Sequence, residues 1–193
     1  MTSYDKQHPK GTKYSETELK RHRDNWYKKV LCGIGLARPA EIVETDKKVY
    51  SRLIEILPWN RSLHFIRHNN FAGFSFETAR LDDLSEFMHE CENPAFEFID
   101  ADLEGLRSAL LHAIHEFTKT VAFQTFPTHN VGWNAVPEEW EDEQPDRFDR
   151  VVNLLHDTAR EVCANYDALV KLATRKLGII PDNAQQENRG DRE

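Results

Sequence analysis

The sequence predicts an all-α protein, a helical bundle built on one long antiparallel helix hairpin. Two observations predict the hairpin: apolar residues recur at steps of three and four over residues 100–125, and again over residues 146–177. A third observation is that residues 127–145, between these segments, carry three prolines and many charges, as a linker does. Two amphipathic helices joined by a connector pack most simply against each other, so we expect a hairpin over residues 100–177.

The chain ahead of the hairpin begins with a polar tail and a basic helix. Residues 1–14 and 181–193 are too polar to bury a core, so we expect disordered tails around a single helical domain over residues 15–180. The run Ser-Glu-Thr-Glu from Ser15 is a capping-box pattern that starts the first helix. Residues 1–29 carry eight basic and four acidic side chains, so the acidic excess of the chain lies after this helix.

Two shorter helices and one irregular segment are expected before the hairpin. The pattern predicts a helix over residues 46–57, capped by Thr45 and stopped by Pro58. Another helix is predicted over residues 79–91. Near residues 62–76, phenylalanines alternate loosely with polar residues, which favours a short irregular segment or a hairpin.

The second helix of the hairpin carries an unbroken heptad seam, and Gly178 is suited to end it. The seam consists of Phe148, Val152, Leu155, Ala159, Val162, Tyr166, Leu169 and Ala173. The first helix of the hairpin begins with Asp100 and Asp102 at its positive end. Its apolar stripe consists of Leu103, Leu106, Leu110, Ile114, Phe117 and Val121. A coiled-coil dimer is the alternative use of the seam. The matching stripe next to it in the chain favours the intramolecular pair.

Several stretches resemble a group of bacterial proteins of no assigned function that end in such a helical hairpin. These stretches are Phe65-Ile66-Arg67-His68-Asn69-Asn70-Phe71-Ala72-Gly73, residues 84–87, residues 98–104 and Thr125-Phe126-Pro127. The resemblance covers about residues 45–178. It implies a bacterial origin and a helical fold, and it implies no activity and no site residue.

Composition and charge exclude several classes of protein. With 193 residues, a net charge of -8 and 30% charged residues, the chain is unlike a basic nucleic-acid coat protein. The longest apolar stretch, residues 30–37, is far too short to span a bilayer, and no signal peptide precedes it. Cys32, Cys91 and Cys163 lie far apart, which predicts reduced thiols in the cytoplasm rather than a disulfide framework or a cysteine zinc site. We expect no cofactor.

Two Arg–His pairs are the candidate catalytic residues. The HEPN family of helical RNases uses an Arg followed by a His after four to six residues, and Arg107 with His112 and Arg150 with His156 match this spacing. A His can act as general acid or base, and an Arg can stabilise phosphate charge in the transition state. With nine His in the chain, such matches also arise by chance. The family's polar residue after the Arg is met only loosely, by Ser108.

Histidines also define the one metal site that the sequence suggests. His112 and His115 lie within about one turn of the first hairpin helix, and His156 lies on the second. A metal held between the two helices is therefore one reading. The first two histidines fall off the apolar stripe, which favours ordinary exposed positions, and we predict no metal.

The densest polar cluster between aromatic residues is Arg67-His68-Asn69-Asn70. It is either an active-site loop or a turn in which the Asn side chains bind the local backbone. We favour the turn, and we then expect Phe71 and Phe74 to lie in the core.

The linker is the candidate partner-binding segment. It is longer than the roughly two to eight residues that a helix–helix connection needs. Trp133 and Trp140 either fold back on the bundle, which we favour, or anchor a partner. Glu138, Glu139 and Glu141 belong to an acidic run that would steer a basic partner.

The sequence therefore predicts a soluble, cytoplasmic, non-enzymatic helical protein that acts through protein–protein interaction or regulation. The alternative is a small HEPN-like RNase or an enzyme with a histidine metal site. We expect a protein partner, which includes a second copy of this chain, and neither a membrane nor nucleic acid.

Overall fold

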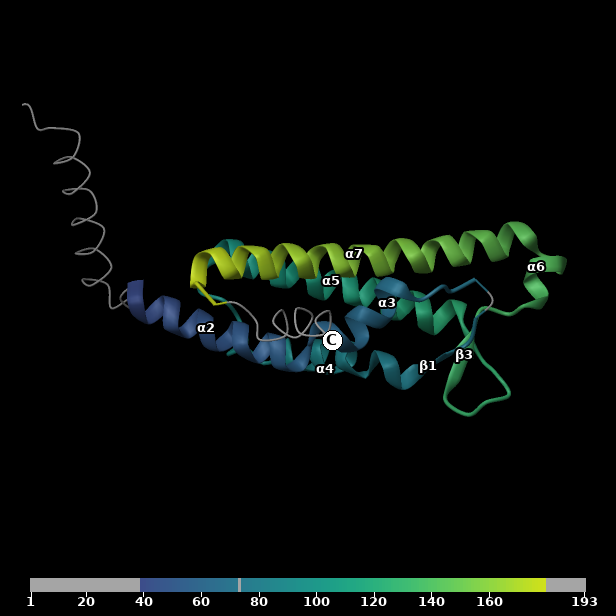
Figure 1. The fold of residues 1–193 in the computed structure, drawn as a ribbon, viewed down its shortest axis with the longest axis horizontal. Helices are drawn as coiled ribbons and strands as arrows, with labels where there is room; N and C mark the ends of the chain where they lie inside the picture. Colours follow the sequence, from purple (N-terminus) through teal and green to yellow (C-terminus); the bar gives the residue numbers. More distant parts are fainter. Residues whose placement is uncertain (1–38, 73, 180–193) are drawn as a thin grey trace, which may run out of the picture. The chain divides into compact units, whose positions relative to one another are not determined.

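The computed structural model describes residues 39–72 and 74–179. The two expected tails and the basic helix that begins at Ser15 lie outside the described residues. Contacts divide the chain between Ile42 and Val43, and the account below concerns the part from Val43 onward. This part is predominantly helical, which confirms the predicted all-α class (Figure 1). None of its described helices combines the length and the apolar character that crossing a membrane requires.

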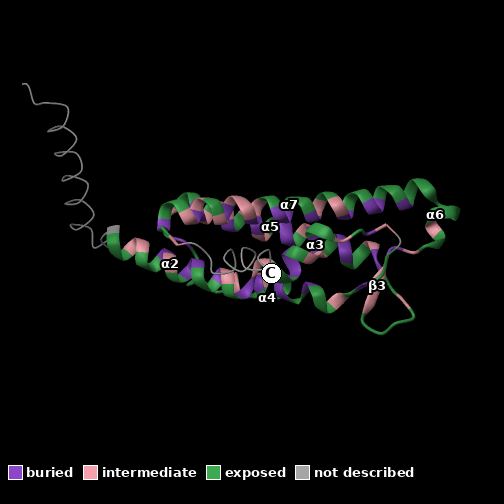
Figure 2. Ribbon diagram, in the orientation of Figure 1, coloured by how far each residue is buried: buried purple, intermediate pink, exposed green. Residues whose placement is uncertain are grey.

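The hairpin predicted from the sequence is the centre of the fold. It consists of α5 (Ala101–Gln124) and α7 (Pro145–Leu177), which lie side by side (Figure 1). Their antiparallel direction is shown by Lys176 at the end of α7, which donates to Asp100 and Asp102 at the start of α5. Every position of the α7 seam is buried, and so are the α5 positions Leu110 and Phe117. Figure 2 shows the buried residues of α7 along the side that faces α5.

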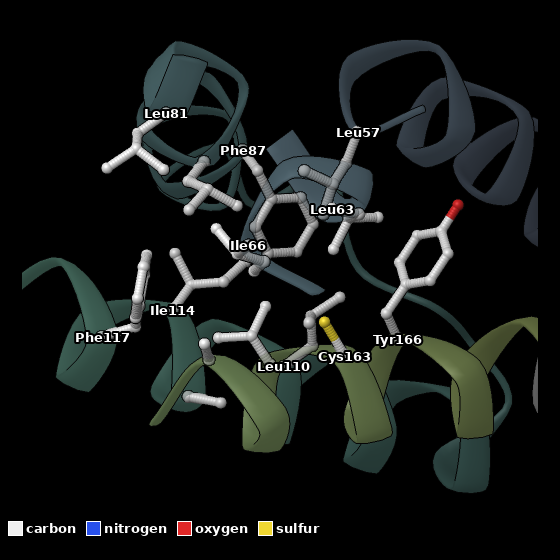
Figure 3. Close-up of a cluster of buried hydrophobic side chains, with 14 of the residues drawn as sticks. Leu57, Leu63, Ile66, Leu81, Phe87, Leu110, Ile114, Phe117, Cys163 and Tyr166 are labelled. Atoms are coloured by element: carbon white, nitrogen blue, oxygen red, sulfur yellow. The ribbon is translucent and has the colours of Figure 1, made fainter. Parts of the chain in front are cut away.

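The shorter helices cover one side of the hairpin. They are α2 (Pro39–Ile56), α3 (His64–His68) and α4 (Asp82–Glu90), and α4 follows a 3-10 turn over Thr78–Leu81. In Figure 3, Leu57, Leu63 and Phe87 point from this side toward Leu110 and Tyr166 of the hairpin. The core is thus one apolar cluster between the hairpin and the shorter helices.

Two of the shorter helices differ from the sequence-based expectation. Helix α2 begins before residue 46, because Pro39 and the residues after it are compatible with a first helical turn. Residues 62–68 are helical rather than irregular: a helical segment over Trp59–Leu63, interrupted at Arg61 (φ -115°, ψ -117°), leads directly into α3. The expected irregular segment is shorter and starts at Asn69.

A buried carboxylate holds the start of α5 against α2. Asp100 caps α5, since its side chain accepts from the N–H groups of Asp102 and Leu103 at 3.1 Å each. Asp46 of α2 is 1% exposed, and its two carboxylate oxygens accept from the N–H groups of Ile99 and Asp100 at 2.7 and 3.1 Å. The chain that enters α5 is therefore fixed by hydrogen bonds to a distant helix.

The expected linker contains regular structure. It includes β2 (Phe126–Pro127), β3 (Trp133–Ala135) and the short helix α6 (Glu139–Glu143). Strand β3 lies between β2 and β1 (Phe76–Glu77) and pairs antiparallel with both, so that Asn134 faces Phe76 on one side and Pro127 on the other. This small sheet ties the end of the hairpin to the segment that follows α3.

Candidate functional site

Four side chains on one face of α7 border a cleft. His156, Arg160, Cys163 and Asp167 are spaced by four, three and four residues, which places them on the same side of a helix. The opposite wall is the segment from Arg67 to Phe71, which begins in the last turn of α3 and continues past its end. The cleft has a volume of about 610 Å³, and Asn69 and Asn70 also line it.

Two contacts fix the ends of this cleft. At one end, Arg67 Nη2 donates to Asp167 Oδ1 at 2.8 Å. At the other end, the N–H of Phe71 donates to His156 Nε2 at 3.1 Å. His156 and Asp167 are separated by about 16 Å along the helix axis at the usual rise per residue. The segment between the two contacts therefore runs along α7 and lies over Arg160 and Cys163.

The Arg67 side chain joins three elements. Its guanidinium lies 4.2 Å from the centre of the Trp59 ring, in addition to its ion pair with Asp167. Burial is the largest single influence and by itself lowers the pKa of Arg67, but the hydrogen bond to Asp167 and the interactions with Asp167 and Cys163 together outweigh burial and raise it. Arg67 thus keeps its charge and holds α3 against α7.

The thiol in the cleft stays protonated near neutral pH. Cys163 is 6% exposed, and this burial raises the pKa of its thiol, although the nearby charge of Arg67 partly opposes the effect. The thiolate is the nucleophilic form of cysteine. Cys163 therefore lacks the activation that a catalytic cysteine needs.

The Arg–His pairs that match the HEPN spacing do not share a face of their helices. Arg107 and His112 are five residues apart on α5, which places them about 140° apart around the axis, and Arg150 and His156 on α7 are about 120° apart. His112 and Arg150 are exposed, whereas His156 is half-buried in the cleft.

Arg107 has a structural partner instead. It is 5% exposed, and its Nε and Nη2 donate to both carboxylate oxygens of Glu104 at 2.5–3.2 Å. Glu104 also accepts from the N–H of Phe98, so the pair ties α5 to the loop before it. The guanidinium also lies 6.0 Å from the centre of the Phe96 ring. The Glu-x-x-Arg spacing in the sequence could have indicated this ion pair.

The three histidines considered as metal ligands are not brought together. His112 and His115 are exposed on α5, and His156 accepts from the Phe71 N–H. Within residues 39–72 and 74–179, no three His, Cys, Asp or Glu side chains are grouped so that they could hold a metal ion.

The polar cluster at the end of α3 only partly matches the expected turn, because Arg67 and His68 are helical and the turn begins at Asn69. Asn70 Oδ1 accepts from the N–H of Ala72 at 3.0 Å, which is the local backbone bond that the turn predicts. Phe71 is 1% exposed and lies in the core, as expected. Phe74 is 62% exposed, so its predicted core position is wrong. The cleft formed by Arg67 and Asn69 was not predicted, because its other wall comes from α7.

The two tryptophans of the connector differ in their surroundings. Trp140 on α6 packs against the core cluster, lies 5.7 Å from the Phe126 ring and is covered by the Arg147 guanidinium at 3.5 Å. This is the fold-back arrangement. Trp133 is half-buried on β3, and it is not among the described residues that pack against the core cluster.

Exposed apolar and acidic side chains gather on the same stretch of chain. Phe123 in the last turn of α5 is 71% exposed and Phe126 is 43% exposed, while Val131 in the turn before β3 is fully exposed. The acidic residues are all exposed as well: Glu138, Glu139, Glu141, Asp142 and Glu143. The exposure of Phe123 could have been predicted from the sequence, because Phe123 lies about 200° around α5 from Val121, which is buried.

Comparisons with known proteins give no relative. No family model matches the chain, and neither the curated proteins nor the solved structures contain a match.

Proposed function

We propose that the protein acts without catalysis, by binding a partner protein through the surface around α6. This α6 surface consists of Phe123, Phe126, Trp140 and the carboxylates of Glu139, Glu141, Asp142 and Glu143. The observation that carries the proposal is the Phe126 ring, which contacts Trp140 and yet stays 43% exposed beside an exposed acidic helix. Large apolar side chains left exposed within a polar rim are typical of protein–protein interfaces.

The charge of the surface specifies the kind of partner. Four carboxylates within five residues of α6 would repel an acidic protein and steer a basic one toward the surface. The Arg147 guanidinium lies over the Trp140 ring, and this single cation does not change the acidic sign of the surface. We therefore expect a basic segment that carries at least one apolar anchor. Two copies of this surface would repel each other, so the favoured partner is a different protein or a different face of a second copy.

The remaining chemistry supports a non-enzymatic role. The two Arg–His pairs face different sides of their helices, Arg107 is committed to Glu104, and the Cys163 thiol stays protonated. We also propose that the protein is bacterial and cytoplasmic. The two cysteines of the described residues, Cys91 and Cys163, are unpaired, which supports a reducing compartment.

The proposal is tested by affinity capture from the host cell with three versions of the protein as bait. The first is the wild type, the second carries Phe123→Ala and Phe126→Ala, and the third carries Leu154→Ala as control. Leu154 on α7 is 44% exposed, about as much as Phe126, and it does not belong to the α6 surface. Thermal melting first checks that all three baits are folded.

We expect one protein with a basic segment to bind the wild type and the Leu154→Ala bait and to be lost from the double variant. Its binding should also weaken as salt is raised, because exposed charges are screened. Recovery of the same partners by all three baits, or loss of the partner from the control as well, would overturn the proposal.

A further inference from the structure

We propose that the cleft between α7 and the segment Arg67–Phe71 binds a small organic molecule that carries a carboxylate or phosphate group. This inference is independent of the α6 surface, because no residue of the cleft belongs to that surface. It rests on the shape of the cleft, on the charge of its walls and on a buried donor without a partner.

The cleft has the size and construction of a small-molecule site. Its volume of about 610 Å³ lies within the roughly 300–1,000 Å³ of such sites. The contacts Arg67–Asp167 and Phe71–His156 hold the segment at both ends, so the space between them is kept open by anchored walls. Its α7 wall includes Cys163 and Ala164, whose small side chains leave that space unfilled.

The walls of the cleft favour an anion. Two guanidiniums, of Arg67 and Arg160, and one carboxylate, of Asp167, line it, in a chain whose net charge is -8. Arg67 uses Nη2 for Asp167, and Arg160 uses Nη2 for Asp157 and Nε for the carbonyl of His156. A guanidinium has five N–H donors. Arg160 Nη1 makes no hydrogen bond within the described part of the chain, so this group has donors for a ligand.

A third donor lies in the same wall. Asn69 Nδ2 is buried and has no hydrogen-bond partner among the described residues. Buried donors of this kind are rare, since more than nine in ten buried polar groups find a partner. A carboxylate or phosphate in the cleft would supply acceptor oxygens to the guanidiniums, and to the amide after a rotation of the Asn69 side chain that turns Nδ2 toward the cleft. A cation would find only one carboxylate in the walls, that of Asp167, beside two guanidiniums.

The experiment follows backbone and side-chain amide signals by NMR while small probes are added to the full-length protein. The anionic probes are inorganic phosphate, phenyl phosphate and benzoate, and benzylamine is the cationic control. We expect at least one anion to shift the signals of Asn69, Phe71 and Ala164 in a saturable way, with a Kd below about 10 mM. Benzylamine should leave these signals unchanged.

Two variants separate the cleft from general attraction to positive charge. Arg160→Gln removes a donor of the cleft, and the 76% exposure of the Arg160 side chain means that the fold should persist, which thermal melting checks. We expect this change to weaken binding at least about tenfold. Arg175→Gln is the control, because Arg175 is exposed on α7 outside the cleft.

Three results would overturn the inference: no saturable shift with any anion, equal binding of benzylamine, or equal weakening by the two variants. A difference between phenyl phosphate and benzoate would identify which anionic group the cleft prefers, and it supports the inference in either direction. The affinity capture with the α6 variants is unaffected by these outcomes, so the two proposals succeed or fail separately.

Discussion

Lys176 Nζ, in the last turn of α7, lies 2.7 and 2.8 Å from the two carboxylate oxygens of Asp100, the residue that caps α5. The hydrogen bond to Lys176 is the largest cause of the lowered pKa of Asp100. One ion pair thus joins the N-cap of one hairpin helix to the last turn of the other.

Replacing Lys176 by Met should lower Tm by a few degrees at most, because the ion pair is exposed to solvent. The loss should be largest at low salt and should shrink at about 1 M salt, where charges are screened over about 3 Å. Thermal melting at two salt concentrations measures this. A loss that is the same at both salt concentrations would contradict a stabilising ion pair, because Met keeps an apolar stem and removes only the charge.

Core substitutions on α7 should have much larger effects. Leu155→Ala should lower the free energy of unfolding by about 2–5 kcal/mol, and Val162→Ala should cost less, because fewer buried methyl groups are lost. Both side chains are 0% exposed. Leu154→Ala is the matched control on the neighbouring position, and it should change stability by less than about 0.5 kcal/mol. Urea denaturation followed by circular dichroism gives all three values, and equal effects at 154 and 155 would contradict the hairpin seam.

The Glu104–Arg107 pair should make stability depend on acid pH. Burial raises the pKa of Glu104, but hydrogen bonds from Arg107 and from the Phe98 N–H outweigh it, and the pKa lies below its ordinary value of 4.5. A carboxylate with a lowered pKa in the folded state stabilises the protein fully above the unfolded value and loses this contribution as pH falls through the folded value.

Free energies of unfolding measured from pH 7 to pH 3 should therefore fall more steeply below about 4.5 in the wild type than in Glu104→Gln. At pH 7 the variant should be less stable by about 2 kcal/mol, since Arg107 keeps a buried charge. Glu161→Gln, an exposed change on α7, serves as control and should keep the steep wild-type profile. A Glu104→Gln profile parallel to that of the wild type would contradict the assignment.

The histidines should differ in their importance for folding. His156→Ala removes the acceptor of the buried Phe71 N–H and a ring 5.6 Å from the Phe71 ring, so it should cost about 1–3 kcal/mol. His112→Ala changes an exposed position of α5 and should cost less than about 0.5 kcal/mol. Chemical denaturation of the two variants tests this, and similar values would show that the Phe71 bond contributes little.

The tryptophans of the connector provide a similar contrast. Trp140→Ala should destabilise the protein by about 2 kcal/mol, because its ring packs against the core, Phe126 and Arg147. Trp133→Ala should cost less than about 1 kcal/mol, since that ring does not reach the core cluster. If Trp133→Ala proves the more damaging change, the small sheet contributes more to stability than its contacts suggest.

The hairpin was predictable because its signal is repeated along the chain. Phe148, Leu155 and Leu169 are each one of many positions that agree on the same helix face, so one exception would not have changed the prediction. The helix over residues 64–68 was missed because it is only five residues long and contains one phenylalanine and two histidines. Its helical state is fixed by packing, with Leu63 and Ile66 buried against the hairpin, and no local pattern contains that information.

The cleft could not be predicted for a related reason. Arg67 and Asp167 are 100 residues apart in the sequence, and only the packing of α3 on α7 brings them together. The candidate catalytic residues were chosen by spacing along the chain, which takes no account of where each residue points. Arg107 was chosen as the partner of His112, five residues later, whereas the helix geometry pairs it with Glu104, three residues earlier.

The pairing of β3 with β1 has a consequence for the order of folding. Phe76 and Asn134 meet across the sheet, and the chain between them includes all of α4 and α5. Closing so long a loop costs more conformational entropy than forming the contacts within a helix, and non-local pairings of this kind slow folding. We expect the hairpin helices to form first and the three strands to join last. Hydrogen exchange should then find the strand amides opening well before those at the centre of α5 and α7.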